Sequence, residues 1–273
     1  MKRGKKKIQI SSINKNLFSN NRNAQVAVFV IVAVLIVVVF LFIFIFKTGK
    51  NDCGSNPLCM IGIKPEIDSL KASVYTCQEE VTTEALKVIG IQGGFYKKPK
   101  YYKDIDSYFI PYYYYSQEFL IPQKITVENE LSSYVDENIM TCLGKMKSNN
   151  YNIEFAIPKT RTVVTNGRTT FTTEMLIVFK TEKTSEILDL KELPISYNSS
   201  LYYILEVADY ITRTHKSDNQ YMICINCVVD MAKERNLYVD MMEYPGLPYT
   251  TLVMISENYT STEPYIFEFL NKY

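Results

Sequence analysis

The sequence predicts an α+β protein in which one N-terminal transmembrane helix precedes an extracytoplasmic domain of paired helices and antiparallel strands. Two observations lead to this prediction. Residues 26–46 form an unbroken apolar run, and further along the chain the hydrophobic period changes from three or four residues to two and back again. Because helices and strands come in runs and do not strictly alternate, we expect antiparallel sheets.

The apolar run reads VAVFVIVAVLIVVVFLFIFIF. As a helix it would be about 31 Å long, close to the hydrocarbon core of about 30 Å. Residues 1–46 carry seven basic residues and no acid, whereas residues 47–273 carry 23 basic residues against 29 acids. The positive-inside rule therefore predicts a cytoplasmic tail at 1–25, a transmembrane helix at 26–46 and all later residues outside a single-pass cell membrane.

The same charge distribution limits the partners. The outer part is mildly acidic and lacks the basic surface that nucleic acid requires, so we expect no nucleic-acid partner. The lipid bilayer is the expected partner of the apolar run, and an envelope polymer, a glycan or another surface protein is expected for the outer domain.

The apolar run is too long for a cleaved secretory signal, which makes it a signal-anchor. The segment Asn23-Ala24-Gln25-Val26 is similar to archaeal class III signal sites, and cleavage at Ala24 is left open. Such a cut would be typical of a pilin-like filament subunit. That subunit would need its helix to continue past Phe46, where Gly49, Gly54 and Pro57 predict a break.

Each element of the outer part is predicted from its own pattern. Residues 47–65 are rich in Gly, Pro, Asn and Asp and predict a linker to a domain at 66–273. Apolar residues spaced by three and four predict helices at 66–90, 125–147, 198–215 and 222–235. Period-two or β-branched segments predict strands at 151–157, 160–164, 169–180, 237–244, 249–256 and 264–270, with turns at Asn166-Gly167 and Pro245-Gly246. A sub-boundary is expected near 181–197.

Tyrosine is unusually common, with 22 residues against no Trp, and it is concentrated in residues 95–122. Tyr112–Tyr115 is the most strand-like part of that segment. One interpretation is that these rings pack across the helices, and we prefer it because aromatic side chains mostly serve cores. The other is an exposed aromatic surface for a glycan, a cell-wall polymer or a partner.

Six cysteines, an even number in an exported domain, suggest disulfides. Cys77 and Cys142 each lie on the apolar stripe of a predicted helix, so their sulfurs meet if the two helices pack antiparallel. The alternative is two buried free thiols. Cys53 and Cys59 flank a Gly/Asn/Pro turn and are candidates for a small loop disulfide.

Cys224-Ile-Asn-Cys227 is the one arrangement with possible redox chemistry, because a CxxC at a helix start stabilises a thiolate. Apolar neighbours such as Ile223, Ile225 and Val228 favour a merely packed pair. Exposure separates the two interpretations, since redox work needs an accessible sulfur and a structural pair is buried.

No catalytic residue, metal site or cofactor is predicted, and a non-enzymatic role is favoured. The chain has one histidine, His215, and no GxSxG, HExxH or phosphate-loop motif. Gly90-Ile-Gln-Gly93-Gly94 predicts a helix stop and a tight turn. Asn198-Ser-Ser and Asn258-Tyr-Thr are candidate glycosylation sites in an exported domain.

Several segments together carry a resemblance that covers nearly the whole chain. They are the basic tail, Ala24-Gln25-Val26, the run from Ile89 to Tyr96, Ile110-Pro111-Tyr112-Tyr113, the helix with Tyr134 and Cys142, Pro264-Tyr265-Ile266-Phe267 and Lys272-Tyr273. With these the chain resembles uncharacterised single-pass membrane-anchored proteins of small-genome archaea that have a class III signal-like N-terminal segment. The resemblance implies export and a Cys77–Cys142 pair, and it implies no activity.

The sequence therefore leaves three functions open. The first is a cell-surface binding or envelope structural module without enzymatic activity. The second is an extracytoplasmic thiol-disulfide redox protein that uses Cys224 and Cys227. The third is a pilin-like filament subunit.

Overall fold

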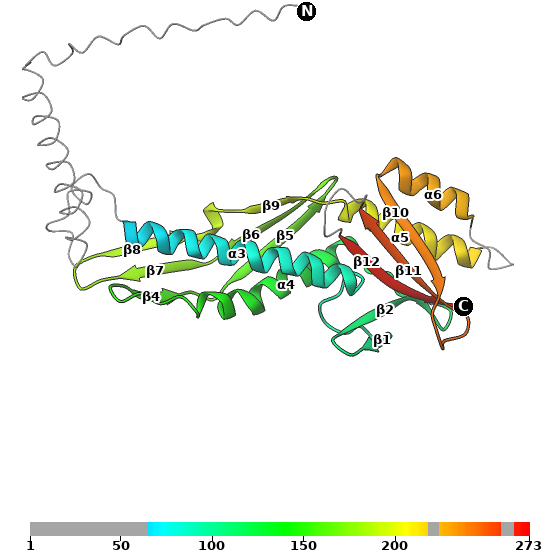
Figure 1. Cartoon of the computed structure of the whole chain (residues 1–273), viewed down its shortest axis with the longest axis horizontal. Helices are drawn as coiled ribbons and strands as arrows, with labels where there is room; N and C mark the ends of the chain where they lie inside the picture. Colours follow the sequence, from blue (N-terminus) through cyan, green and yellow to red (C-terminus); the bar gives the residue numbers. More distant parts are fainter. Residues whose placement is uncertain (1–64, 218–223, 258–264) are drawn as a thin grey trace, which may run out of the picture. The chain divides into compact units, whose positions relative to one another are not determined.

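The computed structural model describes residues 65–217, 224–257 and 265–273 (Figure 1). Glu66–Tyr273 is one compact unit. In its described residues, helices and sheets bury a continuous apolar core to which every described helix contributes.

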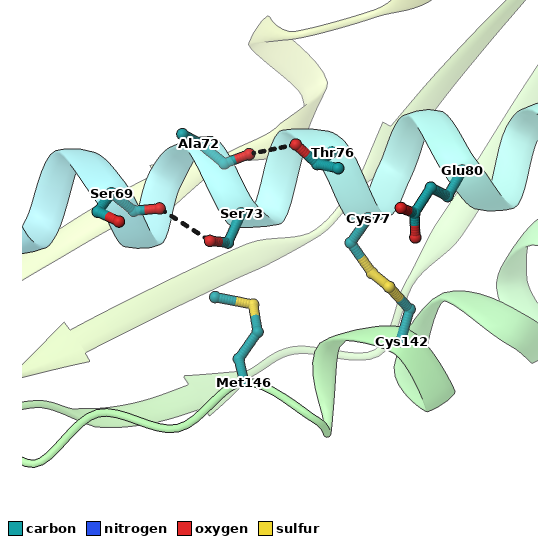
Figure 2. A pocket seen from close by; sticks show the side chains of 8 residues that line it. All are labelled: Ser69, Ala72, Ser73, Thr76, Cys77, Glu80, Cys142 and Met146. Atoms are coloured by element: carbon teal, nitrogen blue, oxygen red, sulfur yellow. Dashed lines mark hydrogen bonds between the residues drawn. A yellow bond between two sulfur atoms is a disulfide. The ribbon is translucent and has the colours of Figure 1, made fainter.

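Two long helices, α3 (Pro65–Ile91) and α4 (Lys124–Leu143), follow the predicted stripes. Their apolar residues at three- and four-residue steps are buried, among them Val74 and Val81 on α3 and Leu131 and Ile139 on α4. A disulfide joins Cys77 of α3 to Cys142 of α4, with 5.9 Å between the Cα atoms (Figure 2). The two helices are therefore linked covalently.

The glycines after α3 act as the predicted stop and turn. Gly90 lies so close to the carbonyl oxygen of Ile266 that a Cβ could not be accommodated, which lets α3 reach the last strand of the chain. Gly93 and Gly94 have φ of 51° and 84°, in the left-handed region that favours glycine. Their amide groups donate to the carbonyls of Gly90 and Ile89, at 3.0 and 2.8 Å.

Residues 152–198 form an antiparallel meander of three long strands, each interrupted near its middle. The first strand comprises β4 (Asn152–Phe155) and β5 (Lys159–Thr165), the second β6 (Arg168–Glu174) and β7 (Leu176–Lys180), and the third β8 (Ser185–Asp189) and β9 (Ile195–Asn198). The interruptions leave two three-stranded sheets, β4-β7-β8 and β5-β6-β9. Gly167, at φ 74°, confirms the predicted turn between β5 and β6.

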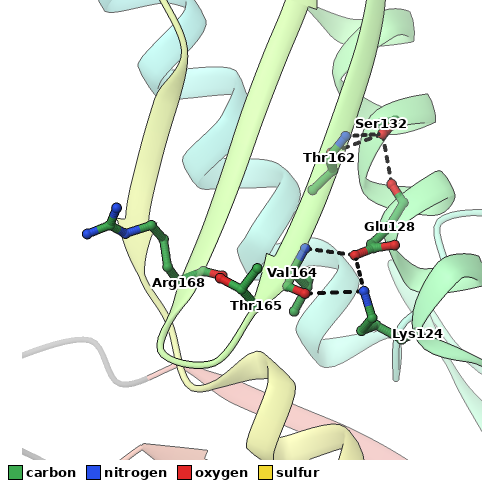
Figure 3. Close-up of polar contacts among 7 residues, drawn as sticks. All are labelled: Lys124, Glu128, Ser132, Thr162, Val164, Thr165 and Arg168. Atoms are coloured by element: carbon green, nitrogen blue, oxygen red, sulfur yellow. Dashed lines mark hydrogen bonds and ion pairs between the residues drawn. The ribbon is translucent and has the colours of Figure 1, made fainter.

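Helix α4 covers the outer edge of β5 (Figure 3). Three α4 side chains, spaced four residues apart, accept hydrogen bonds from alternate backbone N–H groups of that strand. The pairs are Glu128 with Val164 at 2.8 Å, Ser132 with Thr162 at 3.0 Å and Asp136 with Thr160 at 2.7 Å. We call these three contacts the α4 ladder. It satisfies backbone groups that an uncovered sheet edge would leave open.

A third sheet has the strand order β1-β2-β12-β11-β10, with β3 paired to β2. Its strands are β1 (Tyr102–Ile105), β2 (Tyr108–Tyr115), β3 (Glu118–Phe119), β10 (Leu237–Glu243), β11 (Thr250–Glu257) and β12 (Ile266–Lys272). Helices α5 (Leu201–Ser217) and α6 (Ile225–Glu234) pack against β11 and β10. The pairing of β2 with β12 is parallel, whereas the sequence predicted antiparallel sheets.

The tyrosines of residues 95–122 pack against other apolar side chains of the domain. Tyr113 is fully buried, its ring stacks on Phe269 at 4.2 Å between centroids, and its hydroxyl donates to the Gly93 carbonyl at 3.0 Å. A second apolar cluster gathers Ile110, Tyr112 and Leu270 with partly buried rings of Tyr101, Tyr108, Tyr115 and Tyr244. The packing interpretation of residues 95–122 therefore fits the structure better than an exposed aromatic surface.

The predicted fold class needs a correction. It combined the α+β domain with a transmembrane helix, and within the described ranges no helix is both long and apolar enough to cross a membrane. The longest, α3, carries exposed Glu79, Glu80 and Glu84, and each charge at the centre of a bilayer would cost about 3 kcal/mol. The tail at 1–25, the apolar run at 26–46 and almost all of the linker at 47–65 lie outside the described residues.

Candidate functional site

Helix α6 begins directly after Cys224 and is held firmly against α5. Val228 and Ala232 form its buried face. At its end, the Arg235 guanidinium donates to the Met231 carbonyl at 3.1 Å and pairs with Glu206 of α5 at 3.4 Å. The same guanidinium lies 5.8 Å from the ring centroid of Tyr203, another α5 residue. These contacts fix the helix while its first turn stays in contact with solvent.

A disulfide joins Cys224 to Cys227 across that first turn, with 5.3 Å between the Cα atoms. Cys224 occupies the N-cap position, and its Sγ accepts a hydrogen bond from the backbone N–H of Cys227 at 3.3 Å. Both cysteines are exposed, as are Ile225 and Asn226 between them. The pair therefore combines two exposed cysteines with a hydrogen-bond donor aimed at the sulfur of one of them.

The electrostatic setting favours negative charge on Cys224. The first N–H groups of a helix lack partners within the helix and carry a partial positive charge. The first turn of α6 contains no acid that would offset this charge. When the disulfide is reduced, the Cys227 amide and the helix start would stabilise a Cys224 thiolate over the neutral thiol.

The exposure of this pair corrects the sequence-based preference for packed cysteines. Apolar neighbours suggested burial, but Ile225 is 61 % exposed and only Val228 of the nearest described apolar residues is fully buried. The buried face of α6 starts after the second cysteine, because Cys224 is the cap and not part of the helix. The first residue of α6 determines whether the two sulfurs face the core, and the hydrophobic pattern alone could not predict that residue.

The other disulfide has a different setting. Cys77 is 3 % exposed, and the pair with Cys142 lies between α3 and α4 beside a shallow hollow of about 300 Å³. Two hydroxyls in the wall of the hollow, those of Ser73 and Thr76, already donate to helix carbonyls (Figure 2). Glu80 is its one acidic lining residue. The hollow brings together no nucleophile and base, so we assign it no chemistry.

The remaining candidates from the sequence are dispersed. Asn198 is exposed at the end of β9, as a glycosylation site requires. Its glycosylation stays a prediction. Cys53, Cys59 and Asn258 lie outside the described residues. In the ranges with described structure, no three His, Cys, Asp or Glu side chains are grouped to hold a metal ion.

Comparisons with protein-family models, with curated proteins and with solved structures find no match. The resemblance to membrane-anchored archaeal proteins stays a prediction.

Proposed function

We propose that this domain performs thiol–disulfide exchange outside the cytoplasm, with Cys224 and Cys227 as the reacting pair. The observation that carries the proposal is the exposure of both cysteines at the start of α6. The Cys227 N–H that points at the Cys224 sulfur adds to it. A second disulfide, Cys77–Cys142, supports an exported setting, because disulfides persist in oxidising compartments and are rare in the cytosol.

The exchange needs two steps. A thiolate of a substrate protein attacks Sγ of Cys224, the Cys224–Cys227 bond breaks, and Cys227 leaves as a thiolate that takes up a proton. A second substrate thiolate then attacks the substrate sulfur of this mixed disulfide, and Cys224 leaves. Two electrons pass from the substrate dithiol to the cysteine pair, and a substrate disulfide forms. Of the two substrate protons, one is taken up by Cys227 and the other goes to solvent, because Cys224 leaves as a thiolate.

The helix start contributes at the second step. A thiol that is stabilised as a thiolate is a better leaving group, and a stabilised dithiol form makes the pair more oxidising. The Cys227 amide supplies that stabilisation to Cys224. A small-molecule disulfide in the same compartment would restore the oxidised pair by the same chemistry in reverse order.

Trapping of mixed disulfides tests this proposal. In Cys227→Ser, the Cys224 thiolate can attack a substrate disulfide, but no second cysteine remains to release the adduct. We expect the full-length variant to accumulate covalent adducts at Cys224, seen by mass spectrometry as peptides that reductant removes.

Cys224→Ser is the matched control, because Ser is a preferred N-cap and preserves the start of α6. It should trap far fewer adducts, since the remaining sulfur at Cys227 does not receive the N–H hydrogen bond. If neither variant traps adducts, or if both trap them equally, the proposed role of Cys224 is wrong.

The other two functions rest on other residues. A binding or envelope structural role gains no support from the Tyr-rich segment, because those rings pack against one another. The filament hypothesis depends on Ala24 and on a helix past Phe46, and both lie outside the described residues.

A further inference from the structure

Strand β10 forms one edge of the third sheet, on the far side of β11 from β12 (Figure 1). All seven of its residues, Leu237–Glu243, pair with β11 in one register without a shift. A regular antiparallel edge strand directs alternate N–H and C=O groups away from the sheet, and these can pair with another strand.

The other sheet edges of the described chain are shorter or covered. Strands β1, β4 and β9 have four residues each, and β8 has five. Strand β5 has seven, but the α4 ladder occupies its outward N–H groups. From Val239 to Glu243, no hydrogen bond from any described residue outside β11 reaches the β10 backbone. Strand β10 is thus the long edge that remains open in this part of the chain.

The side chains of β10 alternate between a face that packs on the core and a face that is exposed. Leu237, Val239 and Met241 contribute to the core. Tyr238, Asp240 and Met242 point to the other face and are exposed, Tyr238 at 49 % and Met242 at 46 %. The outward pattern is therefore an aromatic residue, an acid and an apolar residue. Glu243 has the parity of the core-facing residues, but it is exposed and adds an acid at the end of the strand.

This charge argues against a second copy of the chain as the partner. Antiparallel pairing of two β10 strands about their centre, or parallel pairing in register, would place two Asp240 carboxylates opposite one another. Like charges directly across a strand pair are destabilising, whereas opposite charges stabilise it. The strand itself contains no basic residue. The complementary partner is a strand with a basic residue opposite Asp240 and apolar residues beside it.

We propose that β10 is a docking strand for an extended polypeptide segment that alternates apolar and basic side chains. The segment adds one strand to the sheet. Backbone hydrogen bonds along Val239–Glu243 supply affinity, and a Lys or Arg opposite Asp240 supplies specificity. This inference uses different residues from the thiol-exchange proposal and does not depend on it.

Synthetic peptides and one charge reversal test the docking strand. The probe is an extended peptide that alternates Val and Lys, and its counterpart alternates Val and Glu. With the full-length chain, we expect the Lys peptide to bind up to about fivefold more tightly than the Glu peptide, the upper ratio that corresponds to one cross-strand charge pair. Binding should slow hydrogen exchange at the amides of Val239–Glu243.

Asp240→Lys should invert this preference without disturbing the fold, because the Asp240 side chain is exposed. Glu182→Lys is the matched control: it makes the same charge change at an exposed position between β7 and β8 and should leave the preference intact. The proposal is overturned if neither peptide slows exchange in β10, or if both variants change the preference equally. Protection of β10 by self-association, without peptide, would also overturn it.

Discussion

Cys224 combines two roles that proteins usually assign to different residues. An N-cap is normally Ser, Thr, Asp or Asn, whose side-chain oxygen accepts a helix N–H. Here a sulfur accepts the Cys227 N–H, and sulfur is a weaker acceptor than oxygen. A cap chosen for helix stability alone would not be cysteine. The residue at this position makes better sense if the sulfur is also needed for its reactivity.

Glu268 is a residue whose burial gives a pH-dependent stability. It lies on β12 opposite Met254, and desolvation raises the pKa of its carboxyl above the ordinary value. A carboxyl with a raised pKa in the folded state binds protons more tightly there than in the unfolded chain. Its contribution is therefore neutral at low pH and becomes unfavourable as the pH rises through the unfolded and then the folded pKa.

We therefore expect Glu268→Gln to be more stable than the wild type at neutral pH. The difference should vanish below the ordinary Glu pKa. Urea denaturation at several pH values measures it, with Glu182→Gln, at an exposed turn, as a control that should show no such trend. A constant difference at all pH values would mean that packing, and not ionisation, separates the two proteins.

At the scale of elements, the α4 ladder holds a helix and a strand together through one buried and two partly buried hydrogen bonds. Glu128 is 6 % exposed, pairs with Lys124 at 2.6 Å and accepts the Val164 N–H. Loss of its carboxylate would leave that N–H buried without a partner.

Glu128→Ala should lower the free energy of unfolding by about 2–4 kcal/mol. The control is Glu137→Ala, also on α4, which removes an exposed ion pair with Lys97 and a hydrogen bond from the Tyr96 hydroxyl and should have little effect. Chemical denaturation of both variants gives the comparison. Equal and small effects would show that water replaces the Glu128 carboxylate at the strand edge.

The elements that the sequence predicted best are those with one dominant period. The stripes of α3 and α4 gave these helices to within a few residues, and Asn166-Gly167 gave the hairpin turn. The break between β6 and β7 could not be predicted, because burial alternates without a gap through Met175. Strands β8 and β9 were missed for a related reason: they are short, and their outward residues are mixed in character.

The sequence predicted the residues of the candidate site but not their exposure. The CxxC spacing drew attention to Cys224 and Cys227, but their exposure depends on where α6 begins and how Arg235 holds it against α5. The open edge of β10 could not be predicted either, since strand order depends on contacts between distant parts of the chain, such as the parallel pairing of β2 with β12.

At the scale of the whole molecule, the two disulfides should contribute unequally to stability. Cys77 and Cys142 are 65 residues apart, and the chain-entropy estimate for such a loop is about 4 kcal/mol. The separation between Cys224 and Cys227 is only 3, for which the same estimate gives about 2 kcal/mol. The long-range link is thus the structural one.

Removal of each pair tests this division. The double variant Cys77→Ala/Cys142→Ala should lose roughly twice as much unfolding free energy as Cys224→Ala/Cys227→Ala, measured by denaturation under non-reducing conditions. If the second variant is the less stable of the two, the exposed pair is a structural staple, and thiol exchange loses its main argument.

The α4 ladder depends on two lengths that are nearly equal, the rise along four residues of helix and the rise along two residues of strand. Four residues of helix advance about 6 Å, and two residues of strand advance about 6.7 Å, so each rung adds a mismatch of about 0.7 Å. Three rungs keep the accumulated error within the reach of a side chain. A fourth would set Met140, which has no strong acceptor, against Pro158, which has no N–H to offer. The series of contacts therefore ends where the helix and strand spacings no longer match. The same sequence pattern would indicate a helix-covered sheet edge in other proteins: polar residues four apart on a helix, next to an alternating strand that is bounded by a proline.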